Sequence, residues 1–248
     1  MTKKKKVILC LVAAAAVLVI GGTLALLSAG TGTKSNTFSS SKYLNIQLRE
    51  PAWDGYTWDE TLPDGSEPDG EHAKTTDTAL GINQSGNYLP GQTIPKDPTV
   101  KNTGSGSEGV PAYVALKVTY SIGGNAVSYA AFQNELLQEA GLDFDTDGWA
   151  LIQEAGTAGQ IYLYGTGDSS GSTGTVLEVG SETSPLFKNV PINKDLQLVA
   201  TTVGEGSDAH TEMLPPAFKI TVKAVAVQSA HVDAGDAANQ LITLIGQP

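Results

Sequence analysis

Apolar and polar residues alternate along four segments of this 248-residue chain. The segments are residues 43–49, 113–120, 196–202 and 218–228. Successive side chains of an extended chain point to opposite faces, so each segment places its apolar residues on one face. The pattern therefore predicts four half-buried β-strands. Weaker patterns predict further strands at residues 99–102, 160–164, 174–179 and 186–190.

A helical period replaces the strand period between residues 129 and 140. The apolar residues there share one helix face: Phe132, Leu136, Leu137 and Ala140. Ser128 is placed to cap the start of this helix, and Gly141 to end it. A second, less regular helix is predicted over residues 234–244.

Residues 51–88 form a polar insert between two predicted strands, with three prolines and a run of acidic residues in its first part. We interpret it as a long surface loop or a partly disordered insert. Many short strands, one helix, 28 glycines and 12 prolines predict the all-β class. The expected architecture is a single β-sandwich over residues 43–248 with a helical insertion.

The N-terminus has the features of an export signal. Four lysines at residues 3–6 precede an unbroken apolar run at residues 7–20, and small residues follow at 21–25. Cleavage is predicted after Ala25, with Ala29 as the alternative. Residues 1–25 would then be a signal peptide. The other interpretation is an uncleaved membrane anchor, because the apolar stretch at residues 7–27 is long enough to cross a bilayer.

Charge and cysteine content exclude several functions. The chain has 15 basic and 26 acidic residues and a net charge of −11, which becomes −15 once residues 1–25 are removed. Such a charge repels phosphate groups, so nucleic acid is not an expected partner. Cys10 is the only cysteine and lies in the apolar run. The mature chain would have no disulfide and no cysteine-ligated metal.

Several short motifs together resemble the TasA/camelysin family of Gram-positive bacteria, exported proteins with a SipW-type signal peptide. The motifs are GGTLA at residues 21–25, NTF at 36–38, PGQTIPKDPTVKNTG at 90–104, PAYV at 111–114, GW at 148–149, SPLF at 184–187 and AVAVQ at 224–228. They extend over most of the chain. Two features depart from the family pattern: residues 26–30 lack its usual aromatic and acidic residues, and the 51–88 insert is longer.

The resemblance implies a jelly-roll-like β-sandwich that is secreted and assembles into fibres of the extracellular or biofilm matrix. It also implies a signal peptidase of the SipW type as a processing partner. The fibre partner would be a second copy or a related matrix protein. In such fibres the mature N-terminal segment, here about residues 26–42, is added as a donor strand to the neighbouring sheet. The alternative is a tail that only links membrane and domain during export.

One sequence motif has the spacing of a calcium-binding loop. Asp143, Asp145, Asp147 and Glu154 fit the pattern D-x-D-x-D-G-x5-E, in which carboxylates coordinate a hard cation. A predicted helix precedes the motif, but Gly156 interrupts the helix that should follow it. We therefore favour a solvated acidic turn over a calcium site. Calcium is the one cofactor that the sequence suggests.

Other candidate chemistry has little support, so no catalytic or cofactor-binding residue is predicted. Metallo-endopeptidase activity, described for camelysin relatives, needs a zinc site, and the H-E-x-x-H spacing is missing. His72, His210 and His231 are interpreted as surface residues.

An aromatic group in the insert could stack on a sugar: Trp53, Tyr56 and Trp58. The leading hypothesis is a structural fibre subunit, and the alternative is a calcium-stabilised adhesin or carbohydrate-binding module.

Overall fold

The computed structural model describes residues 42–166, 173–205 and 208–246. The predicted signal peptide, both predicted cleavage sites and nearly all of the predicted donor segment lie outside these residues. No helix in the described part is long and apolar enough to cross a membrane.

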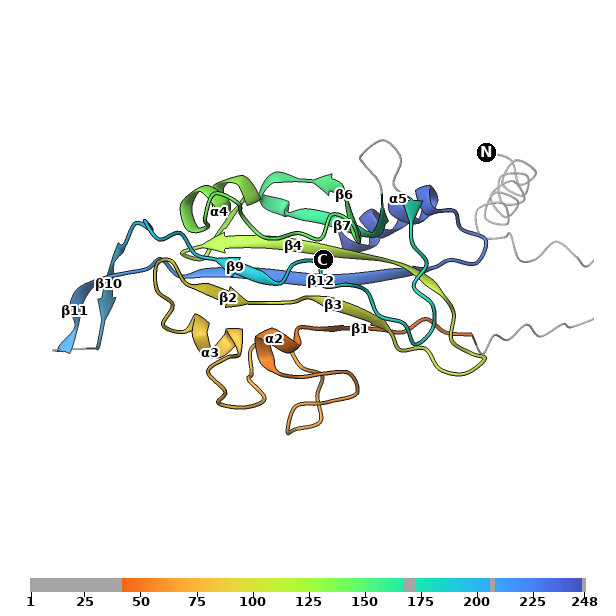
Figure 1. The fold of residues 1–248 in the computed structure, drawn as a ribbon, viewed down its shortest axis with the longest axis horizontal. Coiled ribbons are helices and arrows are strands. Elements are labelled where there is room, and N and C mark those ends of the chain that lie inside the picture. The colour runs from red at the N-terminus through yellow and green to blue at the C-terminus, as the bar shows by residue number, and fades with distance from the viewer. Residues whose placement is uncertain (1–41, 167–172, 206–207, 247–248) are drawn as a thin grey trace, which may run out of the picture. The chain divides into compact units, whose positions relative to one another are not determined.

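An antiparallel sheet forms the centre of the fold (Figure 1). Its strands lie in the order β12 (Phe218–Gln228), β4 (Ala112–Ile122), β7 (Gln160–Thr166) and β6 (Trp149–Glu154). Two short strands extend it: β5 (Asn125–Val127) pairs with β4, and β8 (Thr173–Gly174) pairs with β7. β12 pairs with β4 along its whole length, so the predicted alternation at residues 113–120 and 218–228 is confirmed.

A second layer of shorter strand pairs covers one face of this sheet. In it β1 (Ile46–Arg49) pairs with β3 (Thr99–Asn102), and β2 (Thr93–Pro95) pairs with β9 (Asn189–Pro191). The main core lies between the layers, where inward residues of β4 such as Val114, Leu116 and Val118 are fully buried. The all-β class is confirmed.

The helices lie at the faces and ends of these layers. α5 (Ala234–Ile245) covers the opposite face of the main sheet, where Leu241 packs with Ala115 and Leu163 in a second core. α4 (Tyr129–Leu136) is the predicted helical insertion and buries Phe132 in the main core. The amide of Ala131 donates to the Ser128 hydroxyl, as the predicted cap requires. The one short 3-10 helix of the described part, η1 (Gly156–Ala158), connects β6 and β7.

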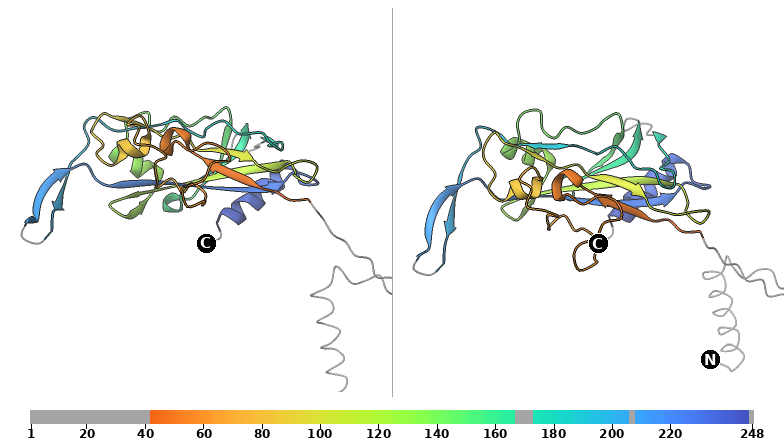
Figure 2. Two further views of the ribbon diagram at one scale, coloured as in Figure 1. Left: turned by 90° about the horizontal axis from the view of Figure 1, so that it is seen from below. Right: turned by 60° about the horizontal axis from the view of Figure 1, so that its bottom comes forward.

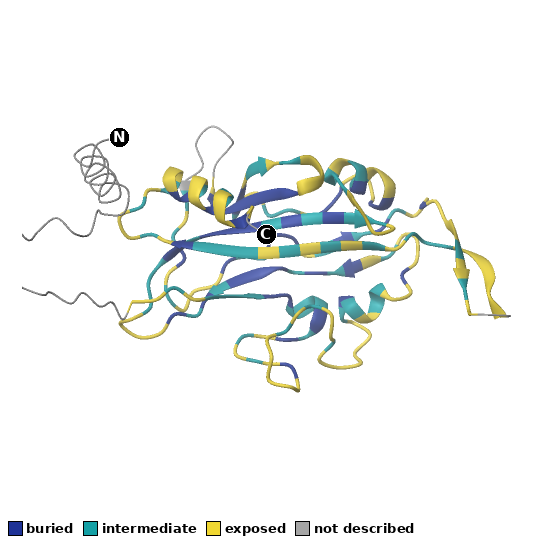
Figure 3. Ribbon diagram, turned by 180° about the vertical axis from the view of Figure 1, so that it is seen from behind, coloured by how far each residue is buried: buried dark blue, intermediate teal, exposed yellow. Residues whose placement is uncertain are grey.

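The predicted strand at residues 196–202 is displaced and differently exposed. The structure has β10 (Val199–Val203) paired with β11 (His210–Leu214) in a hairpin that projects from the body (Figures 1 and 3). Leu198 remains 42% exposed and Met213 59% exposed. The alternation prediction of a buried face was wrong here, because no second layer lies against the hairpin among the described residues.

The expectation of a loose 51–88 insert is also corrected. The segment contains α2 (Pro51–Asp54) and α3 (Gly81–Ser85), and its loops are fastened to the body. Trp53 Nε1 donates to the carbonyl of Gly70 at 2.7 Å. Gly81 allows a close approach, since a Cβ there would lie 2.0 Å from the carbonyl oxygen of Pro95. Polar composition did not prevent order, because a few buried contacts hold many exposed residues.

Asn102 connects three parts of the fold. Its side chain is fully buried and donates to the carbonyls of Val110 at 2.9 Å and Leu177 at 3.2 Å. Its Oδ1 accepts from the amide of Gly104 at 3.1 Å. These bonds tie the end of β3 to the start of β4 and to the chain after β8. The family-like KNTG motif at residues 101–104 thus has a structural role.

Asn102→Ala should destabilise the fold by about 2–3 kcal/mol, because it removes the donor to the Val110 carbonyl, the acceptor of the Gly104 amide and one of the two donors to the Leu177 carbonyl, which keeps the Ala112 amide. Urea unfolding followed by circular dichroism measures the effect. Asn125→Ala is the control, since that exposed side chain makes only a 3.5 Å contact with Gly123. Equal midpoints for the two variants would contradict this role of Asn102.

Candidate functional site: an edge groove and its acidic pocket

Among the described residues, two strands that lie close together have facing edges without a paired strand. β12 is the terminal strand of the main sheet, and β1 pairs only with β3 among the described residues. The two strands are neighbours without a shared ladder (Figure 2). An edge strand presents backbone N–H and C=O groups that another chain can pair with. We call the space between β1 and β12 the edge groove.

Two hollows lie along the edge groove. The first has a volume of about 470 Å³ and lies between Leu48 and Arg49 of β1 and residues 218–222 of β12. The second, of about 530 Å³, is lined by Ile46, Ala224 and neighbouring residues. Apolar side chains from both strands face the main core but are only partly buried: Ile46, Leu48, Ile220, Val222, Ala224 and Ala226. The groove therefore combines open backbone edges with incompletely covered apolar surface.

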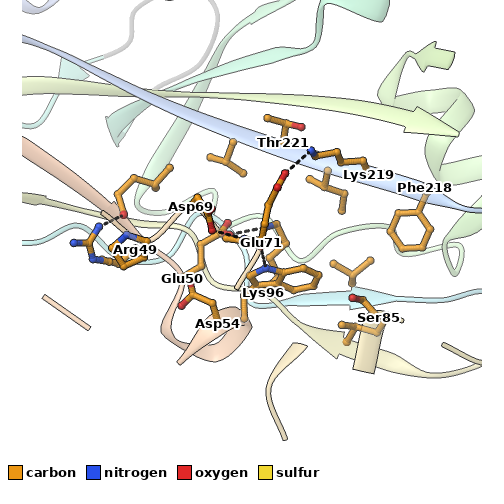
Figure 4. Close-up of a pocket in the computed structure, with 18 residues that line it drawn as sticks. Arg49, Glu50, Asp54, Asp69, Glu71, Ser85, Lys96, Phe218, Lys219 and Thr221 are labelled. Atoms are coloured by element: carbon orange, nitrogen blue, oxygen red, sulfur yellow. Dashed lines mark hydrogen bonds and ion pairs between the residues drawn. The ribbon is translucent and has the colours of Figure 1, made fainter. Parts of the chain in front are cut away.

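The floor of the first hollow, which we call the acidic pocket, contains a buried ion pair (Figure 4). Lys96 Nζ donates to Glu50 Oε2 at 2.6 Å, and both side chains are largely buried. Lys96 also lies over the Trp53 ring, 4.7 Å from its centroid. Glu50 immediately follows β1 and Lys96 immediately follows β2, so the pair joins two strand ends to α2.

Glu50 is not fully satisfied by this pair. The residue is 9% exposed, and its Oε1 is buried without a hydrogen-bond partner among the described residues. A buried acceptor without a donor carries an energetic penalty, which is larger for a charged group. The acidic pocket therefore has an unused acceptor at its floor.

Two further carboxyls lie near Glu50. Burial raises the pKa of Asp54 to about 6, although the amide of Tyr56 donates to it and opposes the shift. Burial likewise raises the pKa of Asp97 to about 6, against the bond that it accepts from the amide of Ala52. The charge of Glu50 raises both values further. The site concentrates negative charge around one paired lysine.

The insert forms the outer wall of the acidic pocket. Glu71 pairs with Lys219 of β12 at 3.2 Å, so an exposed ion pair lies at the mouth of the pocket (Figure 4). Arg49 pairs with Glu67, and Lys74 pairs with Glu60 at 2.6 Å. The Arg49–Glu67 and Glu71–Lys219 pairs hold the insert against β1 and β12, and the Lys74–Glu60 pair lies within the insert.

The predicted calcium ligands are not gathered together. Asp143 accepts from the amides of Lys188 and Asn189, and Asp145 accepts from the amide of Gly148 and the hydroxyl of Ser184. Asp147 is exposed in a turn, and Glu154 ends β6. No group of three or more acidic, histidine or cysteine side chains in the described part could hold a metal ion. Two carboxylates of the motif, those of Asp143 and Asp145, accept hydrogen bonds from the chain itself.

The aromatic group of the insert does not form a shared platform. Trp53 faces the acidic pocket, Tyr56 is buried, and Trp58 donates to Glu182 beside Lys101. The histidines interpreted as surface residues include His72 and His210, which lie exposed beside carboxylates. The adjacent Asp69 raises the pKa of His72.

Sequence reasoning missed the acidic pocket. The family-like motif at residues 90–104 contains Lys96 and Asp97, and the structure gives both a buried role. The available signal for a buried site was this pair of charged residues inside a motif made largely of apolar and turn-forming residues. Its partner, Glu50, gave no such signal, because it borders a polar insert.

Comparisons with known proteins give no functional assignment. No family model and no curated protein matches the chain. Among solved structures, one chain of the CaDoc0917 variant–CaCohA2 complex, crystallised at pH 5.5, aligns with 59% of this chain and 84% of its own length. The identity is 8% and the TM-score is 0.26. Likeness at this level carries no argument about function.

Lys96→Met should destabilise the protein by about 3 kcal/mol, because it leaves Glu50 as a buried charge without its partner. Thermal unfolding at pH 7 measures the loss. The double variant Glu50→Gln with Lys96→Met should recover part of it. Lys194→Met is the control, since Lys194 forms a fully solvated pair with Asp195. A single variant as stable as this control would contradict a buried, functional pair.

Acid should stabilise the region around Asp54 and Asp97. Their pKa values in the folded state, about 6, exceed the ordinary 3.8, so the folded state binds protons more tightly. Their contribution to stability is therefore full below about pH 4 and is lost as the pH rises through about 6. The Asp54→Asn and Asp97→Asn variants carry no charge at these positions and so lack this loss. As the pH rises from 4.5 to 7, the free energy of unfolding of each variant should therefore increase relative to that of wild type, by on the order of 1 kcal/mol. Parallel pH profiles for wild type and variants, from urea titrations, would refute this.

Proposed function

We propose that this protein is a secreted structural subunit of extracellular matrix fibres, with no catalytic role. Assembly proceeds when residues 26–42 of one copy add as a strand along the edge groove of the next. The observation that carries this proposal is the groove itself, two neighbouring strands whose facing edges have no partner strand in the part of the chain that the structure describes.

The groove supports strand addition for two physical reasons. A strand added along the edge of β12 would satisfy its open backbone groups. Cα atoms of β1 and β12 lie within 8 Å of each other, whereas an intervening strand needs about 9.5 Å, so β1 must shift outward to admit it. The added strand would also bury more of the apolar surface that Ile46, Ile220 and Val222 expose only in part. Hydrogen bonding and hydrophobic burial thus favour the same occupant, an extended segment with some apolar side chains.

The N-terminal sequence supports the same proposal. Residues 26–42 consist largely of small and polar residues, without proline, and so suit an added strand. Export and signal removal would free this segment, because a membrane-held N-terminus cannot reach a neighbouring copy. Assembly would then begin only outside the cell. The TasA/camelysin resemblance points to the same class of protein.

A chain beginning at Leu26 should form regular filaments in negative-stain electron microscopy. Deletion of residues 26–42 should abolish them, because the acceptor groove then has no donor. A matched control replaces residues 26–42 with a Gly/Ser segment of equal length, which keeps the length but removes the side chains; it should also fail to assemble. Circular dichroism verifies that each variant remains folded.

Filaments in undiminished yield after the deletion would refute strand donation. If the chain that begins at Leu26 stays monomeric at every concentration tested, the homopolymer is refuted and a binding module is favoured. Addition of calcium in parallel samples separates that alternative, since a calcium-stabilised module would show an increase in melting temperature.

A further inference from the structure

The acidic pocket has the character of a binding site for a cation on a long apolar stem. Glu50 offers a buried, unpartnered oxygen at its floor. Trp53, Ile94 and Phe218 provide apolar walls, and Asp69 and Glu71 add carboxylates around it. A lysine side chain has matching features, because its methylene stem packs on apolar surface while its ammonium donates hydrogen bonds.

The charge around Glu50 also favours a further cation. Asp54 and Asp97 both interact electrostatically with Glu50, and Lys96 forms the ion pair with Glu50 itself. Three carboxyls therefore lie near two buried cations, the Lys96 ammonium and the Arg49 guanidinium, and Arg49 is itself paired with Glu67. An additional ammonium at Glu50 Oε1 would satisfy the unused acceptor and lower the mutual repulsion of these groups.

The N-terminal segment supplies one such cation. Residues 26–42 contain two lysines, Lys34 and Lys42, no arginine, and one aromatic residue, Phe38. Lys42 donates to the Ser107 carbonyl of its own chain, so Lys34 is the candidate. Lys34 and Phe38 are four positions apart, so an extended chain places them on the same face, separated by roughly 13 Å.

The two hollows of the edge groove have a matching spacing. Ile220 lines the acidic pocket and Ala224 lines the second hollow, again four positions apart on one strand face. A segment that places Lys34 in the acidic pocket can therefore place Phe38 in the second hollow, beside Ile46. The register of the added segment would then be set by charge at the acidic pocket and by apolar contact at the second hollow.

We propose that the acidic pocket receives the Lys34 side chain of a second copy, whose ammonium donates to Glu50 Oε1, while Phe38 enters the second hollow. This inference rests on the proposed strand donation and adds its register. The Glu71–Lys219 pair at the mouth must separate to admit the segment. Its cost is small, since exposed ion pairs contribute about 0–1 kcal/mol.

The test compares assembly of chains beginning at Leu26. Lys34→Met should raise the critical concentration for filament formation tenfold or more, whereas Lys34→Arg should stay near wild type because it keeps the cation. Lys188→Met is the matched control, because it removes the same charge from an exposed site on the body. Sedimentation of filaments measures all four proteins. None of these substitutions alters the pocket, so folding of the acceptor is unaffected.

A crosslinking experiment tests the register directly, because the chain without residues 1–25 contains no cysteine. Ser35→Cys, beside an intact Lys34, combined with Ser85→Cys at the pocket wall should give disulfide-linked ladders under oxidising conditions. Ser40→Cys with Ser85→Cys also keeps Lys34 and Phe38; it is the out-of-register control and should give none.

The outcomes separate this inference from the proposed function. If Lys34→Met assembles as well as Lys188→Met, or the ladder is missing while filaments form, the lysine register is wrong but strand donation stands. A crosslinked monomer instead of a ladder would show that the segment folds back on its own chain, which overturns the second-copy occupant. Absence of filaments from the wild-type chain would overturn both.

Discussion

The buried Glu50–Lys96 pair is the interaction on which the arrangement of the groove depends. It joins the ends of β1 and β2, and the Trp53 ring beside Lys96 brings α2 into the same junction. Without it α2 would lose its contact with the end of β2, and the outer wall of the acidic pocket would be held only by the Arg49–Glu67 and Glu71–Lys219 pairs and by the close approach of Gly81 to Pro95. Buried pairs contribute little net stability compared with apolar residues, because desolvation offsets the attraction. The value of this pair therefore lies in fixing geometry, and it leaves one carboxylate oxygen available.

The unpaired edges follow from how the two layers are built. The main sheet has long strands, whereas the second layer consists of short pairs that follow one side of it. β1 and β12 approach each other where the layers meet, but no ladder closes the gap between them. Soluble proteins usually protect such edges with charges, bulges or covering loops. Here the insert and the Glu71–Lys219 pair cover one end only, so protection is partial and reversible.

Sequence predicted the long elements well and the contacts between them poorly. Alternation placed β12 and the inward face of β4 correctly, because one side of each strand packs on a core over many residues. The same alternation at residues 196–202 predicted burial that the hairpin does not have, since period alone does not say whether a second layer exists. The polar composition of the insert led us to predict a loop, although a few contacts between distant residues, such as Trp53 with Gly70, order it. The acidic pocket brings together Glu50 and Lys96, and a local sequence pattern does not predict a contact between residues so far apart in the chain.

Net charge explains why assembly should need a specific cationic contact. The chain has a net charge of −11, which the proposed removal of residues 1–25 with their four lysines would change to −15, so copies repel one another over about 8 Å at physiological ionic strength. Apolar burial in the groove alone would have to overcome this repulsion at every contact. In the proposed assembly, a lysine of the added segment would change the sign of the local interaction, because the acidic pocket gathers carboxylates where the segment would enter. The negative charge that makes free subunits repel one another would then attract the lysine of the added strand and fix its register.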